Sequence, residues 1–95
     1  MTTGPLTDDE IAERLAAHAG WTRAGDTLTR SFEFADFSEA FGFMTRVALA
    51  AERLGHHPDW ENSWNRVDIA VTNHDEGGIT PLCFDLVGRI DRAAS

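Results

Sequence analysis

The sequence has no lysine and no tyrosine, and only one cysteine and three prolines among its 95 residues. Its eight basic residues are all arginine and stand against 16 acidic residues, so the formal net charge is -8. Direct binding to nucleic acids needs clustered basic side chains that neutralise phosphates. The sequence therefore argues against a nucleic-acid partner, and equally against an anionic membrane surface.

The single cysteine, Cys83, excludes a disulfide within the chain and a zinc site built from four cysteines. No apolar run approaches the roughly 20 residues that span a bilayer. The stretch from Met1 to Asp9 lacks the basic and apolar regions of a signal peptide. We therefore expect a cytoplasmic protein, and the length and composition predict one domain over residues 1–95.

A helix is expected near the start of the chain, followed later by a second, stronger helical pattern. Thr7 and Glu10 have the spacing of a capping box, and Gly20 favours the end of that first helix. Between residues 36 and 55 apolar side chains recur at spacings of three and four, which predicts a core-facing stripe that ends at Gly55. That stripe consists of Phe37, Ala40, Phe41, Met44, Val47, Ala48, Ala51 and Leu54. Off it lie Phe43, Leu49 and Ala50, which we interpret as a second apolar surface for subunit contact.

Four strands are expected, over residues 21–23, 28–34, 61–64 and 67–71. The second and fourth alternate apolar with polar residues, as half-buried strands do. Arg30 is the exception, because it lies on the apolar side of its strand. Thr80 and Pro81 then predict the start of a last helix.

The order of elements is therefore α-β-β-α-β-β-α. Hairpin-linked strands favour an antiparallel sheet, and the amphipathic helices can cover only one of its faces. The predicted class is α+β, with a four-stranded antiparallel sheet and three helices packed on one face.

Three of the four histidines follow the ends of predicted elements. His56 and His57 follow the second helix, and His74 follows the last strand. Loops at element ends often carry catalytic side chains, and imidazole exchanges protons near neutral pH because its pKa is roughly 6.5. Glu52, four residues before His56, is expected to approach that ring and favour its protonated form. The other flanking candidates are Asp59 and Asp75, with Trp60 and Trp64 as flat surfaces for a ring-shaped ligand.

Other interpretations stay open for the same residues. A histidine after a helix is also favoured by the helix dipole, and tryptophans are common core residues. Three histidines with a carboxylate can hold zinc, but adjacent histidines rarely direct both rings to one ion, so we expect no metal. Cys83 is more readily explained as a buried helix residue than as a nucleophile.

Several segments, taken together, resemble the pterin-4a-carbinolamine dehydratases. They are residues 40–48, Glu52, the run His56-His57-Pro58-Asp59-Trp60, residues 65–67 and residues 72–75. The resemblance extends from about Leu6 to Asp91. It implies the dehydration of 4a-hydroxytetrahydropterin to quinonoid dihydropterin, as part of pterin recycling, by an enzyme that needs no cofactor and forms a homodimer or homotetramer.

The resemblance and the histidine pattern together define the candidate site. The candidate catalytic residues are His56, His57 and His74. The candidate substrate-binding residues are Glu52, Gly55, Asp59, Trp60, Thr72, Asn73 and Asp75. Our hypothesis is that His56 and His74 divide the acid and base roles, while His57 binds or orients the substrate.

One position departs from the family pattern. The family commonly has an aspartate near the start of the last helix, where this chain has Cys83. Asp85 lies about 200° around the helix from that position and is no obvious replacement. Some family members assist transcription-factor dimerisation or protein assembly. The alternative function is therefore a non-catalytic pterin-binding or protein-assembly module on the same fold.

Overall fold

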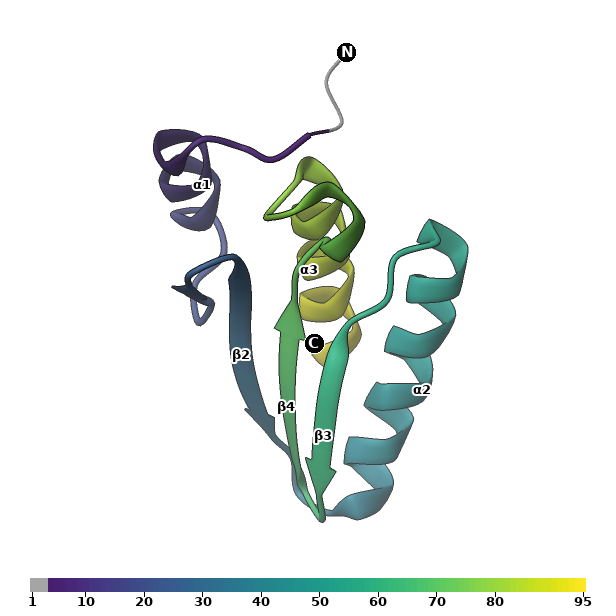
Figure 1. The fold of residues 1–95 in the computed structure, drawn as a ribbon. Coiled ribbons are helices and arrows are strands. Elements are labelled where there is room, and N and C mark those ends of the chain that lie inside the picture. Colours follow the sequence, from purple (N-terminus) through teal and green to yellow (C-terminus); the bar gives the residue numbers. More distant parts are fainter. Residues whose placement is uncertain (1–3) are drawn as a thin grey trace.

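The computed structural model describes residues 4–95 and contains one four-stranded antiparallel sheet with three helices (Figure 1). The elements are α1 (Asp8–Leu15), β1 (Thr22–Ala24), β2 (Thr27–Glu33), α2 (Phe37–Leu54), β3 (Asp59–Ser63), β4 (Arg66–Val71), the 3-10 turn η1 (His74–Glu76) and α3 (Pro81–Ala94). The predicted α+β class and element order are confirmed. The first three residues of the predicted domain lie outside the described part of the chain.

The strands lie in the order β1-β2-β4-β3, so β2 and β4 occupy the centre of the sheet. Their buried side chains share one face, as in the pairs Leu28–Val71 and Phe32–Val67. On that face α2 and α3 pack against each other and against β4 (Figure 1). The opposite face carries polar side chains and is not covered by a described helix, so the core is one layer between sheet and helices.

The predicted capping box at the start of α1 is confirmed. The backbone N–H of Thr7 donates to Glu10 Oε1 at 2.9 Å, and the backbone N–H of Glu10 donates to Thr7 Oγ1 at 3.2 Å. Hydrogen bonds with the backbone and side chain of Thr7 lower the pKa of the Glu10 carboxyl. The helix ends at Leu15, earlier than Gly20, because the chain then turns to carry Trp21 into the core.

The face of α2 that packs on the sheet differs from the prediction. Its buried residues are Ala40, Phe43, Val47 and Ala51. Phe37 and Phe41, expected in the core, are 47% and 55% exposed. Phe43, expected on the outer surface, is buried with its ring 4.9 Å from those of Phe32 and Phe34. The prediction is confirmed for Ala40, Val47 and Ala51, and Met44 and Leu54 pack partly buried against the core. It was wrong for the phenylalanines, because the small residues and the valine fit both patterns and only the position of the sheet decides between them.

The hairpin between β3 and β4 also lies earlier than expected. The strand β3 begins at Asp59, and the turn consists of Trp64 and Asn65. Trp64 adopts a left-handed conformation with φ of 48°. The Asn65 amide donates to the Phe34 carbonyl at 2.9 Å, so this turn is held against the end of β2.

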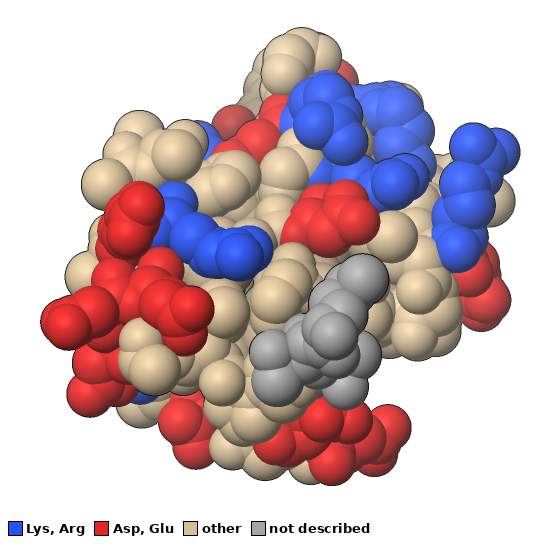
Figure 2. Space-filling model, turned by 90° about the horizontal axis from the view of Figure 1, so that it is seen from above, with Lys and Arg blue, Asp and Glu red and all other residues tan. Residues whose placement is uncertain are grey.

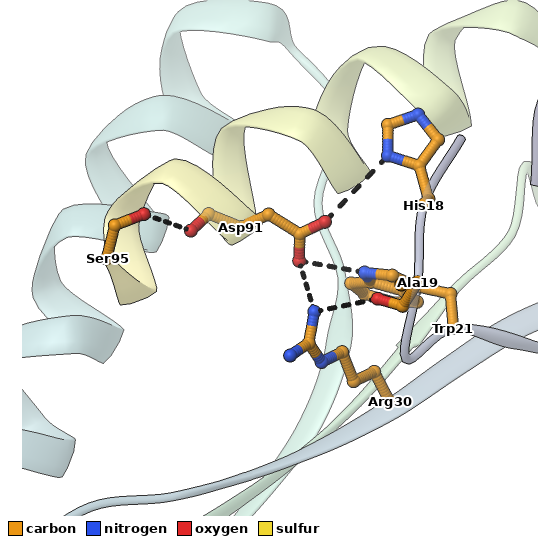
Figure 3. Close-up of polar contacts among 6 residues, drawn as sticks. All are labelled: His18, Ala19, Trp21, Arg30, Asp91 and Ser95. Atoms are coloured by element: carbon orange, nitrogen blue, oxygen red, sulfur yellow. Dashed lines mark hydrogen bonds and ion pairs between the residues drawn. The ribbon is translucent and has the colours of Figure 1, made fainter.

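A polar cluster explains the arginine on the apolar side of β2. Asp91 Oδ1 of α3 accepts hydrogen bonds from Arg30 Nη1 at 3.0 Å and from Trp21 Nε1 at 2.9 Å (Figure 3). Arg30 also donates to the Ala19 carbonyl at 3.2 Å, and His18 Nδ1 lies 3.8 Å from Asp91 Oδ2. The cluster joins α3 to β2 and to the segment that precedes β1.

Candidate active site

The three candidate histidines lie at one end of the sheet, where α2 ends, β3 begins and β4 ends (Figure 1). His56 and His57 lie between α2 and β3, and His74 opens the 3-10 turn after β4. Asp59, the first residue of β3, pairs with Ala70 near the end of β4. Strand pairing therefore brings the two histidine-bearing segments side by side.

Gly55 ends α2 with φ of 67°, and the resulting turn separates the two adjacent histidines. The Gly55 N–H donates to the Glu52 carbonyl at 3.2 Å, and the His56 N–H donates to the Ala51 carbonyl at 3.1 Å. In such a Schellman turn the residue after the glycine folds back over the last helical turn. His56 is accordingly only 8% exposed, whereas the side chain of His57 is 57% exposed.

The buried ring of His56 faces a thiol. Its Nε2 atom lies 3.5 Å from Cys83 Sγ. Burial lowers the pKa of His56, the neighbouring charge of His57 lowers it further, and a hydrogen bond with the Thr72 backbone opposes both. The expectation that Glu52 approaches His56 and favours its protonated form was wrong, because Glu52 lies beside His57 and burial lowers the pKa of His56.

Two exposed histidine–carboxylate pairs flank this buried ring. His57 Nε2 lies 3.4 Å from Glu52 Oε1, and His74 Nε2 lies 3.5 Å from Asp59 Oδ2. Exposed ion pairs add little stability to the fold. We therefore infer that these two pairs serve to orient the imidazole rings.

A tight loop carries the other predicted binding residues, Thr72, Asn73 and Asp75. The Asn73 backbone exchanges hydrogen bonds with Gly78, at 3.1 Å and 3.2 Å, and so closes the loop. The Thr72 hydroxyl donates to the Asp26 carbonyl, toward the β1–β2 turn. Asp75 is exposed. Of these residues, Thr72 forms a hydrogen bond to His56 through its backbone.

The two tryptophans differ in position. Trp60 is half-buried beside the core and pairs with Ile69. Trp64 lies in the hairpin turn at the other end of β3 and is 64% exposed. A strand of this length separates it from the histidines by about 17 Å. The interpretation of Trp64 as a flat surface beside the histidines was therefore wrong.

The end of the molecule that bears the histidines is an open surface. A hollow of about 1120 Å³ is lined by Asn73, Thr80, the segment before α1, the α1 residues Glu10 and Arg14, and the start of α3. Another, of about 540 Å³, lies on the polar sheet face beside Asp59 and Trp60. None of the three histidines lines either hollow. Seen from this end, acidic side chains gather at the left and lower edges of the view, and basic ones lie mainly at the upper right with a further basic patch at the centre-left (Figure 2).

Within residues 4–95, no group of three or more His, Cys, Asp and Glu side chains is placed to hold a metal ion. None of the described helices is long and apolar enough to cross a membrane.

The sequence analysis did not predict that Thr80 and Cys83 lie beside the candidate histidines. Thr80 was expected only as a helix cap, and Cys83 only as a core residue that replaces an aspartate. The contact between Cys83 and His56 spans 27 residues of the chain. No local pattern signals it, although a buried polar residue at a helix start is a reason to search for a partner.

Comparisons with known proteins identify the family of the chain and agree with its fold. The chain matches the family model for pterin 4 alpha carbinolamine dehydratase over residues 4–93. It is 54% identical, over 95% of this chain and 96% of the relative, to a provisionally assigned pterin-4-alpha-carbinolamine dehydratase of Rhodospirillum rubrum. A crystal structure of a transcriptional coactivator/pterin dehydratase from Brucella melitensis gives a TM-score of 0.94 at 44% identity, covering 97% of this chain and all of that one.

A more distant likeness concerns the fold alone. A pterin dehydratase-like protein identified as a RuBisCO assembly factor in the α-carboxysome gives a TM-score of 0.66 at 21% identity. That match covers 82% of this chain and 93% of the other. The family model and the near relatives, in contrast, span almost the whole sequence. The chain belongs to the pterin-4-alpha-carbinolamine dehydratase family.

Proposed function

We propose that the protein is a dehydratase that converts 4a-hydroxytetrahydropterin to quinonoid dihydropterin and water in pterin recycling. Family membership supports the substrate class. The observation that carries the reaction is the pair of exposed imidazoles, His57 and His74, each with a carboxylate within 3.5 Å at the same end of the sheet. We keep the cytoplasmic location as part of this proposal.

The reaction removes a hydroxyl group from carbon 4a and a proton from a ring nitrogen. A protonated imidazole gives its proton to the departing oxygen, which leaves as water. A neutral imidazole takes the proton from the ring nitrogen, so the two histidines exchange protonation states and the net proton count does not change. Imidazole suits both steps because its ordinary pKa lies near neutral pH.

We assign the two proton transfers to His57 and His74, which revises the hypothesis that His56 acts with His74. A general acid or base must come within hydrogen-bond reach of the substrate. His56 is buried, and its ring is engaged by Cys83 and by the Thr72 backbone. The proposed substrate contacts are Gly55, Trp60, Thr72, Asn73 and Asp75, with Glu52 and Asp59 as orienting carboxylates.

A coupled assay with enzymatically generated 4a-hydroxytetrahydropterin tests the proposal. We expect wild type to accelerate dehydration above the uncatalysed rate and His74→Ala to lose most of that acceleration. His18→Ala is the matched control, because His18 lies in the cluster around Asp91 and not at this end of the sheet. A folded wild-type protein with no acceleration would refute the enzymatic function.

The second candidate is a non-catalytic pterin-binding or assembly module. It is favoured by the thiol of Cys83 at a position where relatives commonly have an aspartate, and by the absence of the histidines from both described hollows. Calorimetric titration with a pterin product analogue separates the possibilities. Binding without dehydration would support the module, and dehydration would support the enzyme.

We also propose that the exposed apolar side of α2 forms a contact between subunits. The rings of Phe37 and Phe41 lie 5.6 Å apart on that side, and Leu49 is 67% exposed. Large exposed apolar side chains on one helix favour association, and homo-oligomers most often form by two-fold symmetry. This surface replaces the one predicted around Phe43, which lies in the core.

A further inference from the structure

A continuous chain of hydrogen bonds runs beneath the exposed histidines. Asn73 Nδ2 lies 3.3 Å from Thr80 Oγ1, which lies 3.6 Å from Cys83 Sγ. The same sulfur lies 3.5 Å from Nε2 of His56. The exposed fractions of Thr80, Cys83 and His56 are 1%, 0% and 8%. The chain therefore crosses the protein interior from the loop after β4, through the start of α3, to the end of α2.

The amide end of this chain has a fixed direction, because an amide nitrogen can only donate and Thr80 Oγ1 therefore accepts from Asn73. Between Thr80 Oγ1 and Cys83 Sγ either atom can be the donor, and the role of His56 Nε2 depends on the tautomer of the ring. A neutral ring with its proton on Nδ1 makes Nε2 the acceptor of the thiol hydrogen. The Thr80 hydroxyl then donates to the sulfur, which also accepts the Thr80 backbone N–H at 3.5 Å.

The surroundings of His56 agree with a neutral ring. The titratable groups that face it are His57 from the same loop and Cys83 from α3, and the end of β4 supplies the Thr72 backbone. Among the described residues no carboxylate forms an ion pair with His56, although both exposed histidines have one. A charged ring would be costly at this buried position without such a partner.

Each end of the chain is the sequence neighbour of an exposed histidine. Asn73 precedes His74, and His56 precedes His57. We propose that Asn73, Thr80, Cys83 and His56 are positioning residues that hold His56 as a neutral anchor and set the spacing between His57 and His74. The kinetic consequence rests on the proposed function, whereas the protonation of His56 does not.

The protonation of His56 is tested by long-range proton–nitrogen NMR correlation of the histidine rings at about pH 7.5, with the His56 signals assigned through His56→Gln. We expect a protonated Nδ1 and an unprotonated Nε2 in wild type and in Cys83→Ser, because serine also donates. A proton on Nε2, or a doubly protonated ring, would overturn the proposal. In Cys83→Asp the carboxylate cannot donate, so we expect the pKa of His56 to rise.

The positioning role is tested by dehydration kinetics. We expect Cys83→Ala and Thr80→Val to lower kcat by about tenfold to a hundredfold, the range of effects that small misplacements cause. Cys83→Ser should restore kcat to within about threefold of wild type. Val87→Ala, one turn further along the same buried face of α3, is the packing control and should keep kcat.

Unchanged kcat in both chain-breaking variants would overturn the spacing role, even where the NMR result holds. Two variants are used because Cys83→Ala leaves a cavity, while Thr80→Val preserves shape. If wild type shows no dehydration, the proposed function fails. In that case the affinity for a pterin analogue is measured instead. Equal losses of affinity in Cys83→Ala and in the control Val87→Ala would overturn the spacing role. A loss of affinity in Cys83→Ala and Thr80→Val, but not in Val87→Ala, would support it.

Discussion

The carboxylate of Asp59 lies 3.5 Å from Nε2 of His74 and reaches it from the first residue of a neighbouring strand. The position of this imidazole thus depends on the pairing of β3 with β4 as well as on its own loop. Both side chains are largely exposed, at 73% and 80%. The contact therefore contributes orientation of the ring more than stability of the fold.

Asp59→Asn should accordingly lower kcat by about tenfold while the melting temperature stays nearly unchanged, because an uncharged amide orients the imidazole less firmly than a carboxylate does. Steady-state dehydration rates and thermal melts measure the two effects. Glu61→Gln, an exposed acid on the same strand, serves as the control. Equal losses in both variants would point to a general effect of charge.

His57→Gln and His74→Gln should each lower kcat by about a hundredfold to ten-thousandfold, because each removes one of two proton-transfer groups. The double variant should lose little more than the worse single variant, since the two groups serve one concerted event. Rates from the coupled assay decide this. Full activity in His57→Gln would contradict the assignment of a proton transfer to His57 and would favour the earlier hypothesis that His56 acts with His74.

Stability should fall as the pH is lowered through the range in which His56 titrates. Burial lowers its pKa below the usual 6.5, so the unfolded chain binds the proton more tightly than the folded protein. The contribution of His56 is full above about pH 6.5 and is lost as the pH falls through the folded pKa. Urea unfolding of wild type should show this decrease, and His56→Gln should lack it.

The carboxylates contribute in a separate range. The pKa of Asp68 is lowered by hydrogen bonds from Ser31 and Arg66, and that of Glu10 by its bonds with Thr7. Their stabilisation is present above their usual pKa values of 3.8 and 4.5 and is lost at lower pH.

The range between about pH 7 and pH 5 therefore tests His56 alone. If the free energy of unfolding of wild type and of His56→Gln changes equally with pH in that range, the role of His56 is contradicted.

Asp91→Ala should destabilise the fold by about 1.5–3 kcal/mol, the usual worth of hydrogen bonds to a charged group. It leaves Arg30 and Trp21 without their acceptor on α3 (Figure 3). Asp85→Ala, which removes an exposed pair with Arg89 on the same helix, should cost only about 0.3–0.5 kcal/mol. Urea midpoints of the two variants make the comparison.

Phe41→Glu should reduce the mass in solution if the exposed side of α2 joins subunits, because a charge at the centre of an apolar contact is costly to bury. Light scattering after size-exclusion chromatography gives the mass. Ala12→Glu adds the same charge on exposed α1 and should leave the mass of wild type unchanged. Equal masses for all three proteins would rule out this surface.

The elements of the fold were predictable because their signals are local. Thr7 and Glu10 lie within one helical turn, and Gly55 ends α2 by its own backbone conformation. The orientation of α2 was not predictable in the same way. Its phenylalanines permit two stripes, and the choice of Phe43 over Phe41 depends on a sheet built from distant residues.

The candidate site was also predictable only in its local features. The histidines were found because they follow predicted helix and strand ends, and their grouping follows from the pairing of β3 with β4. Asp59 was named among the flanking carboxylates and lies beside His74. The pairings of Glu52 with His57 and of Cys83 with His56 were not predicted, because His56 turns inward after Gly55 and Cys83 approaches it only through the packing of α3 on α2. Contacts across elements have no spacing rule in the sequence.

The turn at Gly55 makes two adjacent and identical side chains unequal. The residue at position 56 must fit an interior space, whereas the residue at position 57 is constrained mainly by what binds at the surface. Natural variation should thus tolerate different replacements at the two positions.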